Sequence, residues 1–393
     1  MRREELEERA RKLAPVIAER VAERVAECER LRRLPAETVA DFKRLGLLRA
    51  FVAPAYGGYG LPIGTVIGTS RTIARACGSS GWCLAICTLH NHVVSGFPES
   101  VQEQVFASNP DAVVCGVFMP VGRAVLTDAG ARVSGAWEFA STCDHADHAV
   151  LAAFSCDTAD GDPTGVVNVL VDRKDFEIED NWHVAGLCGT GSKRVIVDDV
   201  FVPKERIRSG EAEAFGDAAG QRGGQRQSQG LPGNSVATLG LTGVALGIAE
   251  GALERFRERL ATKLRVVSFQ GADQQVGAQL RYAESAAEVD AAGLVVERDL
   301  AEMTEDARLG REATLEKRAR YRRDAAWVVR TCSGAVARLQ PAAGAHAIFL
   351  DDPMQRAVRD IQSVSAHVVA NWDQAAESFA RVETGLPAAD PVL

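Results

Sequence analysis

The change of residue pattern along the chain limits the fold more than any other feature. From about Asp111 to Pro203 the sequence consists of short runs rich in Val, Ile and aromatic residues, each broken by Gly or Asp. AVVCGVF, HAVLAAFS, GVVNVLVD and RVIVDDVFVP are examples. Runs of this length and composition are typical of β-strands. We therefore predict a mainly antiparallel sheet in the middle of the chain.

Helical patterns flank this central region on both sides. Leu6, Ala10, Leu13, Ile17 and Val21 recur at spacings of three and four, as on one face of a helix. Residues 63–95 are apolar enough for a buried helix pair, and residues 236–379 return to long helical patterns. The fold class is therefore α+β. It comprises an N-terminal helical domain (1–110), a central β domain (111–205) and a C-terminal helical bundle (236–393).

Residues 206–235 form a long insert between the β domain and the last helices. The insert is rich in Gly, Gln and Ser and has few large apolar residues. A loop of this length inside a compact protein is usually a lid or a disordered segment. We therefore expect a flexible loop or lid over residues 206–235.

Charge and composition exclude several classes of function. The 393 residues carry a formal net charge of −8, which argues against a nucleic-acid partner. No apolar stretch of about 18 residues occurs and the first residues are charged, so we expect a cytoplasmic protein without a membrane span. The nine cysteines contain no CxxC pair, and we expect reduced thiols and no metal site.

Several common cofactor and catalytic motifs are absent from the sequence. No GxGxxG follows a predicted strand, and no P-loop, HExxH or GxSxG occurs. The chain therefore lacks the minimal signals of a Rossmann dinucleotide site, a phosphoryl-transfer site, a zinc protease and an α/β-hydrolase. Any cofactor must be held by a different scaffold.

The segment GAWEFAST (135–142) is the first candidate for a ligand site. In a strand, alternate residues share a face, so Trp137, Phe139 and Ser141 are expected on one side of the sheet. A flat heteroaromatic ligand could pack on the rings and bond to the hydroxyl. The pattern also fits an ordinary aromatic pair in a sheet core, which is the commoner case.

A second candidate is the turn Gly186–Lys193, which contains three glycines and two hydroxyl residues. Such a turn leaves many backbone N–H groups free and can form a nest for an anion or for the polar edge of a cofactor. A glycine-rich turn without a ligand fits the same pattern equally well.

The histidines are the remaining candidates. His367 follows the helical stretch 351–365, in which Gln355 and Arg359 are four residues apart; a histidine on such a face is more often a core residue. His90 and His92 follow the apolar segment WCLAICTL, and the alternatives to a site role are helix-end packing or a polar cap. His145 and His148 form a similar HxxH pair, but no convergent set of Asp, Glu or Cys residues accompanies it, so we expect no metal there.

Taken in order, these segments resemble the acyl-CoA dehydrogenase superfamily over nearly the whole chain. Within this superfamily, the chain most resembles the oxygenase components of two-component flavin-dependent monooxygenases (group D). It rests on GAWEFAST (135–142), GLCGTGSKRVIVDDVFVP (186–203) and DDPMQRAVRDIQSVSAH (351–367). It implies N-terminal helices, a central β-sandwich or barrel, and a C-terminal four-helix bundle.

One position distinguishes the branches of this superfamily. Acyl-CoA dehydrogenases commonly carry a catalytic Glu shortly after the third motif, but residues 365–371 contain no carboxylate. Removal of an α-proton from an acyl thioester needs a positioned base. The oxygenase branch instead commonly has His where His367 stands. Acyl-CoA dehydrogenation and N-oxygenation of an amine are kept as alternatives, as is a flavin-free scaffold protein that retains the fold.

The resemblance also implies a mechanism. Reduced FAD or FMN arrives from a separate reductase and reacts with O2 to give a flavin C4a-hydroperoxide, which hydroxylates a small phenol, indole or polyketide-like molecule. By resemblance, Ser141 bonds near flavin N5, His367 manages proton transfer, and His90 or His92 orients or deprotonates the substrate. The cofactor-binding set that the resemblance implies is Trp137, Phe139, Ser141, Thr142, Gly189, Thr190, Ser192 and Arg359. A homotetramer or homodimer is expected.

Overall fold

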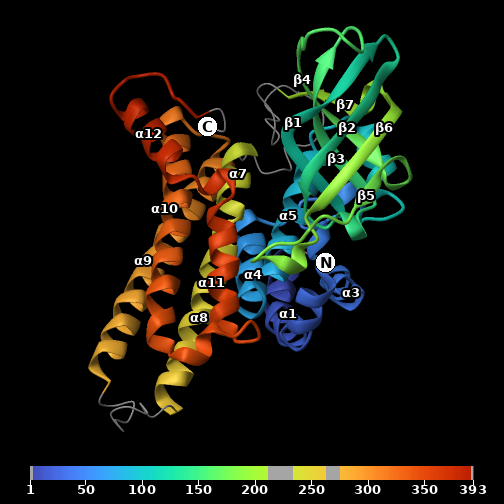
Figure 1. Ribbon diagram of the computed structural model, residues 1–393. Helices are drawn as coiled ribbons and strands as arrows, with labels where there is room; N and C mark the ends of the chain where they lie inside the picture. The colour runs from blue at the N-terminus through green and yellow to red at the C-terminus, as the bar shows by residue number, and fades with distance from the viewer. Residues whose placement is uncertain (1–2, 211–232, 263–274, 391–392) are drawn as a thin grey trace.

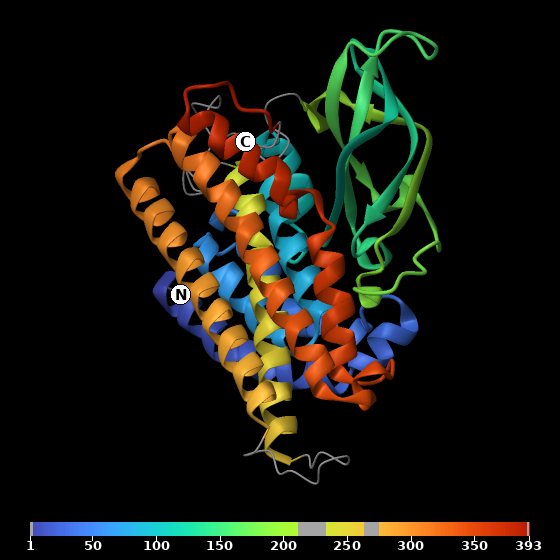
Figure 2. The same ribbon diagram turned by 60° about the vertical axis from the view of Figure 1, so that its left-hand side comes forward.

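The computed structural model describes residues 3–210, 233–262, 275–390 and 393. Two helical regions lie side by side and a sheet stands against one end of them (Figures 1 and 2). This order of helices, sheet and helices confirms the predicted α+β class. Most of the predicted lid (206–235) lies outside the described residues. Its start does not form a loop, because a short strand, β7 (Ile207–Ser209), pairs with the sheet.

The N-terminal region is helical. Its α-helices are α1 (Arg3–Glu23), α2 (Val25–Leu31), α3 (Ala36–Leu45), α4 (Ile63–Ala76), α5 (Gly78–Val94) and α6 (Glu99–Phe106). Ala10, Ile17 and Val21 are buried on α1, as their spacing predicts. Every residue of α5 is buried, and α4 packs beside it, so the predicted buried helix pair is confirmed.

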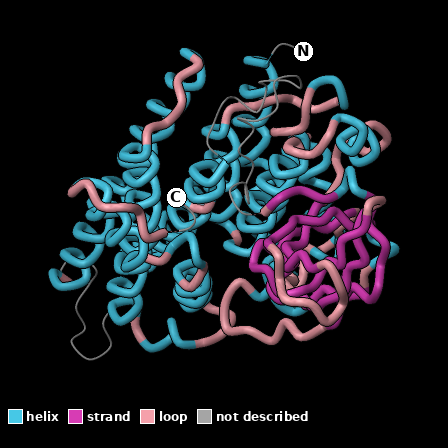
Figure 3. The backbone as a smooth tube through the Cα atoms, turned by 90° about the horizontal axis from the view of Figure 1, so that it is seen from above, coloured by secondary structure: helices cyan, strands magenta, loops and turns pink. Residues whose placement is uncertain are grey.

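The central region is one seven-stranded sheet. Its strands are β1 (Val114–Thr127), β2 (Gly130–Ala140), β3 (His148–Cys156), β4 (Gly165–Asp172), β5 (Glu177–Glu179), β6 (Lys193–Pro203) and β7. They are arranged in the order β5-β6-β2-β1-β3-β4-β7. β1 and β3 are parallel and the other pairings are antiparallel, so the sheet is mixed but mainly antiparallel. Figure 3 shows the strands curled around a common interior.

The C-terminal region is built from long helices. They are α7 (Gly233–Gly240), α8 (Thr242–Thr262), α9 (Val276–Leu309), α10 (Leu315–Leu339), α11 (Pro353–Ser365) and α12 (Trp372–Glu383). α8, α9, α10 and α11 pack as a bundle, with α12 against α10. The stretch Ser235–Ala261 is long and apolar enough to cross a membrane, but 89% of its most apolar window is buried, as in the core helix of a soluble protein.

The two helical regions meet where α8 lies against α4. A Cβ atom on Gly247 would lie 2.2 Å from the carbonyl oxygen of Arg71, so only glycine permits this approach of the two backbones. Gly243 and Gly251 meet α4 in the same way, one turn before and one turn after. α4 and α5 therefore share one continuous core with the bundle, which fixes α5 relative to α11.

Candidate active site

Three buried hydroxyl groups form a chain between the sheet and the glycine-rich turn. Ser141 follows the end of β2, and its Oγ lies 2.7 Å from Oγ of Ser192, which in turn lies 2.7 Å from Oγ1 of Thr190. The backbone N–H of Thr142 donates to the carbonyl oxygen of Thr190 at 2.9 Å. Its Oγ1 lies 3.3 Å from Sγ of Cys87 on α5. The structure thus brings together four of the predicted site residues from two distant segments.

Trp82 of α5 connects this hydroxyl chain to His367. Its indole Nε1–H donates to Oγ of Ser141 at 3.1 Å. Its ring meets the imidazole of His367 edge to face, with 5.3 Å between ring centroids. Trp82 is 6% exposed. The sequence analysis missed this residue, because a tryptophan inside an apolar helix has the pattern of a core residue.

The turn Gly186–Ser192 is held by groups from three helices. Oδ1 of Asp360 on α11 accepts the N–H of Leu187 at 2.7 Å, and Oγ of Ser79 on α5 accepts the N–H of Gly189 at 3.1 Å. A Cβ on Gly189 would lie 2.1 Å from Sγ of Cys28 on α2. The expectation of a nest with many free N–H groups is therefore wrong for Leu187 and Gly189, whose amides are already bonded. The polar groups that the turn adds to the site are the hydroxyls.

Burial raises the pKa of Asp360 to about 6, against the effect of the Leu187 N–H, which lowers it. The carboxylate is the stronger acceptor for this amide, since charge-assisted hydrogen bonds are stronger than neutral ones. Asp360 is thus a second residue that the sequence analysis did not assign. Its only sequence signal was its place four residues after Arg356.

Trp137 and Phe139 do not share a face, so that prediction is wrong. The pairing of β2 with β6 shifts register between Trp137 and Ala140, and Phe139 has a φ of 64°. Trp137 is fully buried, and its Nε1–H donates to the carbonyl oxygen of Ala152 at 2.6 Å. Its ring belongs to the interior of the sheet and offers no surface to a ligand. Phe139 is 67% exposed, with its ring edge-on to Trp182.

His90 and His92 lie in different surroundings although both are on α5. Nδ1 of His90 lies 3.1 Å from the carbonyl oxygen of Val114, so Nδ1 carries the proton of the neutral ring and Nε2 is the free acceptor. Burial lowers the pKa of His90 to about 4; the hydrogen bond to Val114 opposes this shift, and the charge of His367 adds to it.

His92 packs instead against Phe51, with 5.2 Å between the ring centroids. Neither of its ring nitrogens has a hydrogen-bond partner among the described residues. Burial, and then the charge of Arg208, lower the pKa of His92 to about 4. These surroundings favour His90 over His92 as the site residue.

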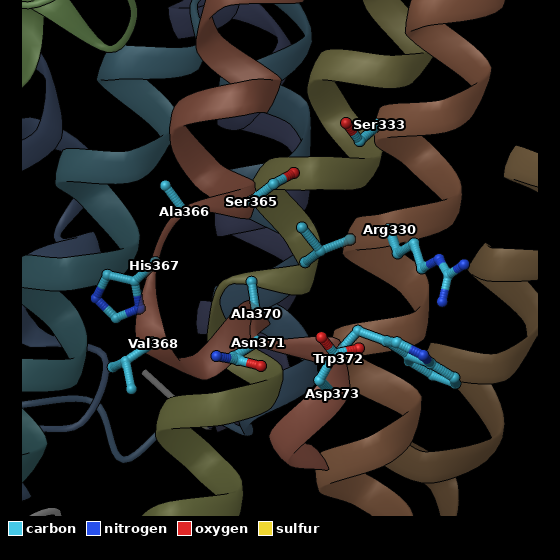
Figure 4. Close-up of a pocket in the computed structure, with 11 residues that line it drawn as sticks. Arg330, Ser333, Ser365, Ala366, His367, Val368, Ala370, Asn371, Trp372 and Asp373 are labelled. Carbon is cyan, nitrogen blue, oxygen red and sulfur yellow. The ribbon is translucent and has the colours of Figure 1, made fainter. Parts of the chain in front are cut away.

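His367 begins the turn between α11 and α12. Its Nδ1 accepts the N–H of Val369 at 3.3 Å, so the proton of the neutral ring lies on Nε2. Burial, and then the charge of Arg322, lower the pKa of His367 to about 4. The same turn borders a groove of about 470 Å³ that is shared by α10 and α12. Figure 4 shows the imidazole directed away from Arg330 and Trp372.

Arg359 lies on α11 beside the turn and away from the hydroxyl chain. Its guanidinium pairs with Oε1 of Glu29 at 3.0 Å and donates to the carbonyl oxygen of Ala185 at 2.6 Å. A third contact joins it to Gln355. Within one chain, Arg359 thus ties α11 to α2 and to the start of the turn.

The donor set of the site fits a flavin. An indole N–H and a run of hydroxyls suit the polar edge of an isoalloxazine, and the exposed Phe139 ring suits its flat face. Among the residues that the structure describes, no group of three His, Cys, Asp or Glu side chains could hold a metal ion. All nine cysteines are free thiols.

Two family models match the chain. They are the acyl-CoA dehydrogenase N-terminal domain over residues 3–104 and the acyl-CoA dehydrogenase C-terminal domain over residues 239–372. The fold and these matches together define the class of this protein: it has the acyl-CoA dehydrogenase fold.

Curated relatives define the family of this chain more narrowly than the family models do. The chain is 34% identical to the oxygenase component of the FADH2-dependent resorcinol hydroxylase of Rhizobium sp. (strain MTP-10005), over 91% of this chain and 90% of that one. The chain belongs to the oxygenase components of the flavin-dependent monooxygenases.

Solved structures agree with this assignment. The 3-HSA hydroxylase from Rhodococcus sp. RHA1 superposes with a TM-score of 0.90 at 30% identity, covering 97% of this chain and 98% of that one. XiaF from Streptomyces sp., in complex with FADH2 and glycerol, also gives 0.90 at 28% identity, covering all of this chain and 98% of that one.

Proposed function

We propose that this chain hydroxylates a small phenol or related aromatic compound, with reduced flavin delivered by a separate reductase and O2 as the oxidant. Bound reduced flavin would supply the two electrons that activate O2. The observation that carries the proposal is the link through Trp82, which joins the buried hydroxyl of Ser141 to the partly exposed imidazole of His367. The names of the relatives, among them the resorcinol hydroxylase, support an aromatic substrate.

His90 and His367 carry the proton on different ring nitrogens, and this gives them complementary roles. His90 has a free Nε2 lone pair, and at neutral pH its ring is uncharged. It can therefore accept the proton of a phenol hydroxyl and make the ring more nucleophilic. His367 is also uncharged but carries its proton on Nε2, so it acts as a hydrogen-bond donor toward the oxygen being transferred.

The hydroxyl chain would hold the flavin edge. Because Ser192 and Thr190 bond to one another, the hydroxyl of Ser141 has a defined partner on the protein side and a second position for the cofactor. Burial of these groups keeps water from the reacting centre, where stray protons would divert activated oxygen to peroxide. Phe139 would contact the ring face of the flavin.

The test uses chemically reduced FAD or FMN and a panel of phenols in aerated buffer. Product carrying one added oxygen atom is measured by mass spectrometry, and hydrogen peroxide is measured in parallel. We expect Ser141→Ala to raise peroxide release, and His90→Ala and His367→Ala to lower product. His92→Leu, on the same helix as His90, is the matched control. Wild-type product-to-peroxide ratios in all three variants would contradict the assignment.

The alternative activities are not favoured. Residues 365–371 contain no carboxylate that could remove an α-proton, and the relatives are named as oxygenase components rather than dehydrogenases. Bleaching of protein-bound oxidised flavin by an acyl-CoA would restore the dehydrogenase reading. An amine that gains oxygen in the same screen would restore N-oxygenation.

We also propose a cytoplasmic homodimer or homotetramer. Leu280 and Leu294 on α9 are 65% and 60% exposed, and Ile348 and Leu350 are each 70% exposed. Apolar surface of this kind is typical of contacts between subunits. Light scattering after gel filtration gives the mass directly, and a monomer at micromolar concentration would contradict the proposal.

A further inference from the structure

The turn that carries His367 is bonded to a buried ion pair, formed by Arg322 and Asp390. Nη2 of Arg322, on α10, donates to the carbonyl oxygen of Val368 at 3.0 Å, and Nη1 donates to that of Val369. The remaining donor, Nε, binds Oδ2 of Asp390 at 2.8 Å. All three nitrogens of one guanidinium are thus used. Two of them bond to the two residues that directly follow His367.

Asp390 comes from the end of the chain rather than from a helix of the bundle. Its backbone N–H donates to Oγ of Ser378 on α12 at 3.3 Å, and Nε of Arg381 donates to the carbonyl oxygen of Pro387 at 2.7 Å. The segment after α12 therefore folds back along that helix. Its carboxylate reaches a guanidinium that is 2% exposed.

A buried cation at this place is an expensive way to hold a turn. Taking a charge out of water costs several kcal/mol even when it is paired, and an apolar pair would hold the same volume at no greater cost. The cation does one thing that an apolar pair cannot: it opposes a proton on His367, and its charge is one of the two causes of the low pKa of that imidazole.

We propose that Arg322 and Asp390 are a positioning pair for His367, through which the C-terminal segment takes part in oxygen transfer without touching the reacting atoms. The guanidinium fixes the turn, and its charge keeps the imidazole neutral with the Nε2 proton available for donation. Asp390 compensates that charge and orients the fork of Arg322 toward the two carbonyls. This inference rests on the role of His367 proposed above.

Other titratable groups lie on the elements around this imidazole. They are His90 on α5, Arg330 on α10 and Asp373 on α12. Arg330 stacks on Trp372, with 5.1 Å from its guanidinium carbon to the ring centroid, and Figure 4 shows it on the far side of the groove from His367. Burial and then the charge of Arg322, rather than these groups, lower the pKa of His367.

Two variants separate the two effects of the pair. Arg322→Met combined with Asp390→Leu removes both charges of the pair, so that neither member is left buried without the other, and the fold is expected to survive. Arg322→Lys keeps the charge but loses the fork, because one ammonium group cannot bond to both carbonyls and the carboxylate. Asp41→Asn is the control. It breaks a buried carboxylate–arginine cluster between α1 and α3, remote from His367.

The measurements are the product-to-peroxide ratio and the titration of His367, followed by NMR of the full-length chain labelled at histidine. The His367 resonance is assigned by its loss in His367→Ala. A misplacement of about 1 Å can cost about 100-fold in rate. We therefore expect both Arg322 variants to lower the ratio at least about tenfold. We expect the pKa of His367 to rise in the double variant and to stay low in Arg322→Lys.

The outcomes are distinguishable. A wild-type ratio and titration in the double variant would overturn the proposal, as would an equal fall of the ratio in Asp41→Asn. If His367→Ala itself keeps the wild-type ratio while the double variant still moves the His367 titration, the pair positions the imidazole as proposed. In that case it is the catalytic role of His367 that fails.

Discussion

His92 should be one of three histidines, with His90 and His367, that make the folding stability of this protein sensitive to acid, because burial lowers the pKa of each to about 4. His92 is 4% exposed and neither of its ring nitrogens has a hydrogen-bond partner among the residues that the structure describes, so a proton on the ring gains no hydrogen bond there. Burial and the charge of Arg208 lower its pKa from 6.5 to about 4. The unfolded chain therefore binds this proton between about pH 6.5 and 4 and the folded chain does not. Stability from this group is present above pH 6.5 and is lost as the pH falls.

The size of the effect follows from the two pKa values. A difference of 6.5 against about 4 corresponds to about 2 kcal/mol of lost folding free energy at pH 5, and to almost none at pH 7.5. In His92→Leu this loss is absent. We expect the variant to lie within about 1 kcal/mol of wild type at pH 7.5, since an apolar residue replaces an unpaired polar one.

Urea unfolding at pH 7.5 and pH 5 measures both numbers. The variant should retain about 2 kcal/mol more stability than wild type on going to pH 5. His346→Leu, at an exposed histidine, is the control and should follow wild type. A variant with the same pH dependence as wild type would refute the reasoning, because it would mean that His92 is hydrated or paired in the native protein.

Three further changes test the site and the packing that supports it. Trp82→Phe keeps an aromatic ring beside His367 but removes the N–H that donates to Ser141. We expect reduced flavin to bind about 1 kcal/mol, or fivefold, more weakly in an anaerobic fluorescence titration. An unchanged affinity would show that this hydrogen bond does not contribute to flavin binding. Asp360→Ala leaves the buried amide of Leu187 unpaired, and it should lower both the flavin affinity and the free energy of unfolding, the latter by about 1–3 kcal/mol. Asp360→Asn keeps an acceptor for this amide and should lose less, and equal losses in the two variants would show that the hydrogen bond is not the cause. Gly247→Ala places a methyl group against the backbone of α4 and should lower the free energy of unfolding by about 1–3 kcal/mol. Gly334→Ala, in open space on α10, is the control and should be neutral or stabilising. A Gly247→Ala protein as stable as wild type would show that α4 and α8 can separate at little cost.

The candidate site shows where local pattern reasoning failed. Strand alternation predicts that Trp137 and Phe139 share a face, and a single register shift with a positive φ at Phe139 reverses this. The glycine-rich turn was predicted correctly as a turn. Its amides, however, are occupied by Asp360 and Ser79 from distant helices, which no local signal could reveal.

The sequence by itself determined the order of helices, strands and helices, the buried pair α4 and α5, and the segments that carry Ser141, Ser192 and His367. These follow from hydrophobic periodicity and from short motifs, both of which are local properties of a chain. The branch of the superfamily also followed from the sequence, because it depends on the residue type at one position of a motif.

Only the tertiary structure decided which side chains meet. It gave His90 and His92 different surroundings, because two positions on one helix face about 200° apart. It placed Trp82 between Ser141 and His367, and brought Asp390 from the end of the chain to the back of the same turn. Contacts of this kind depend on how distant elements pack, and the glycine seam between α4 and α8 that fixes their packing appears in the sequence only as three glycines in one helix.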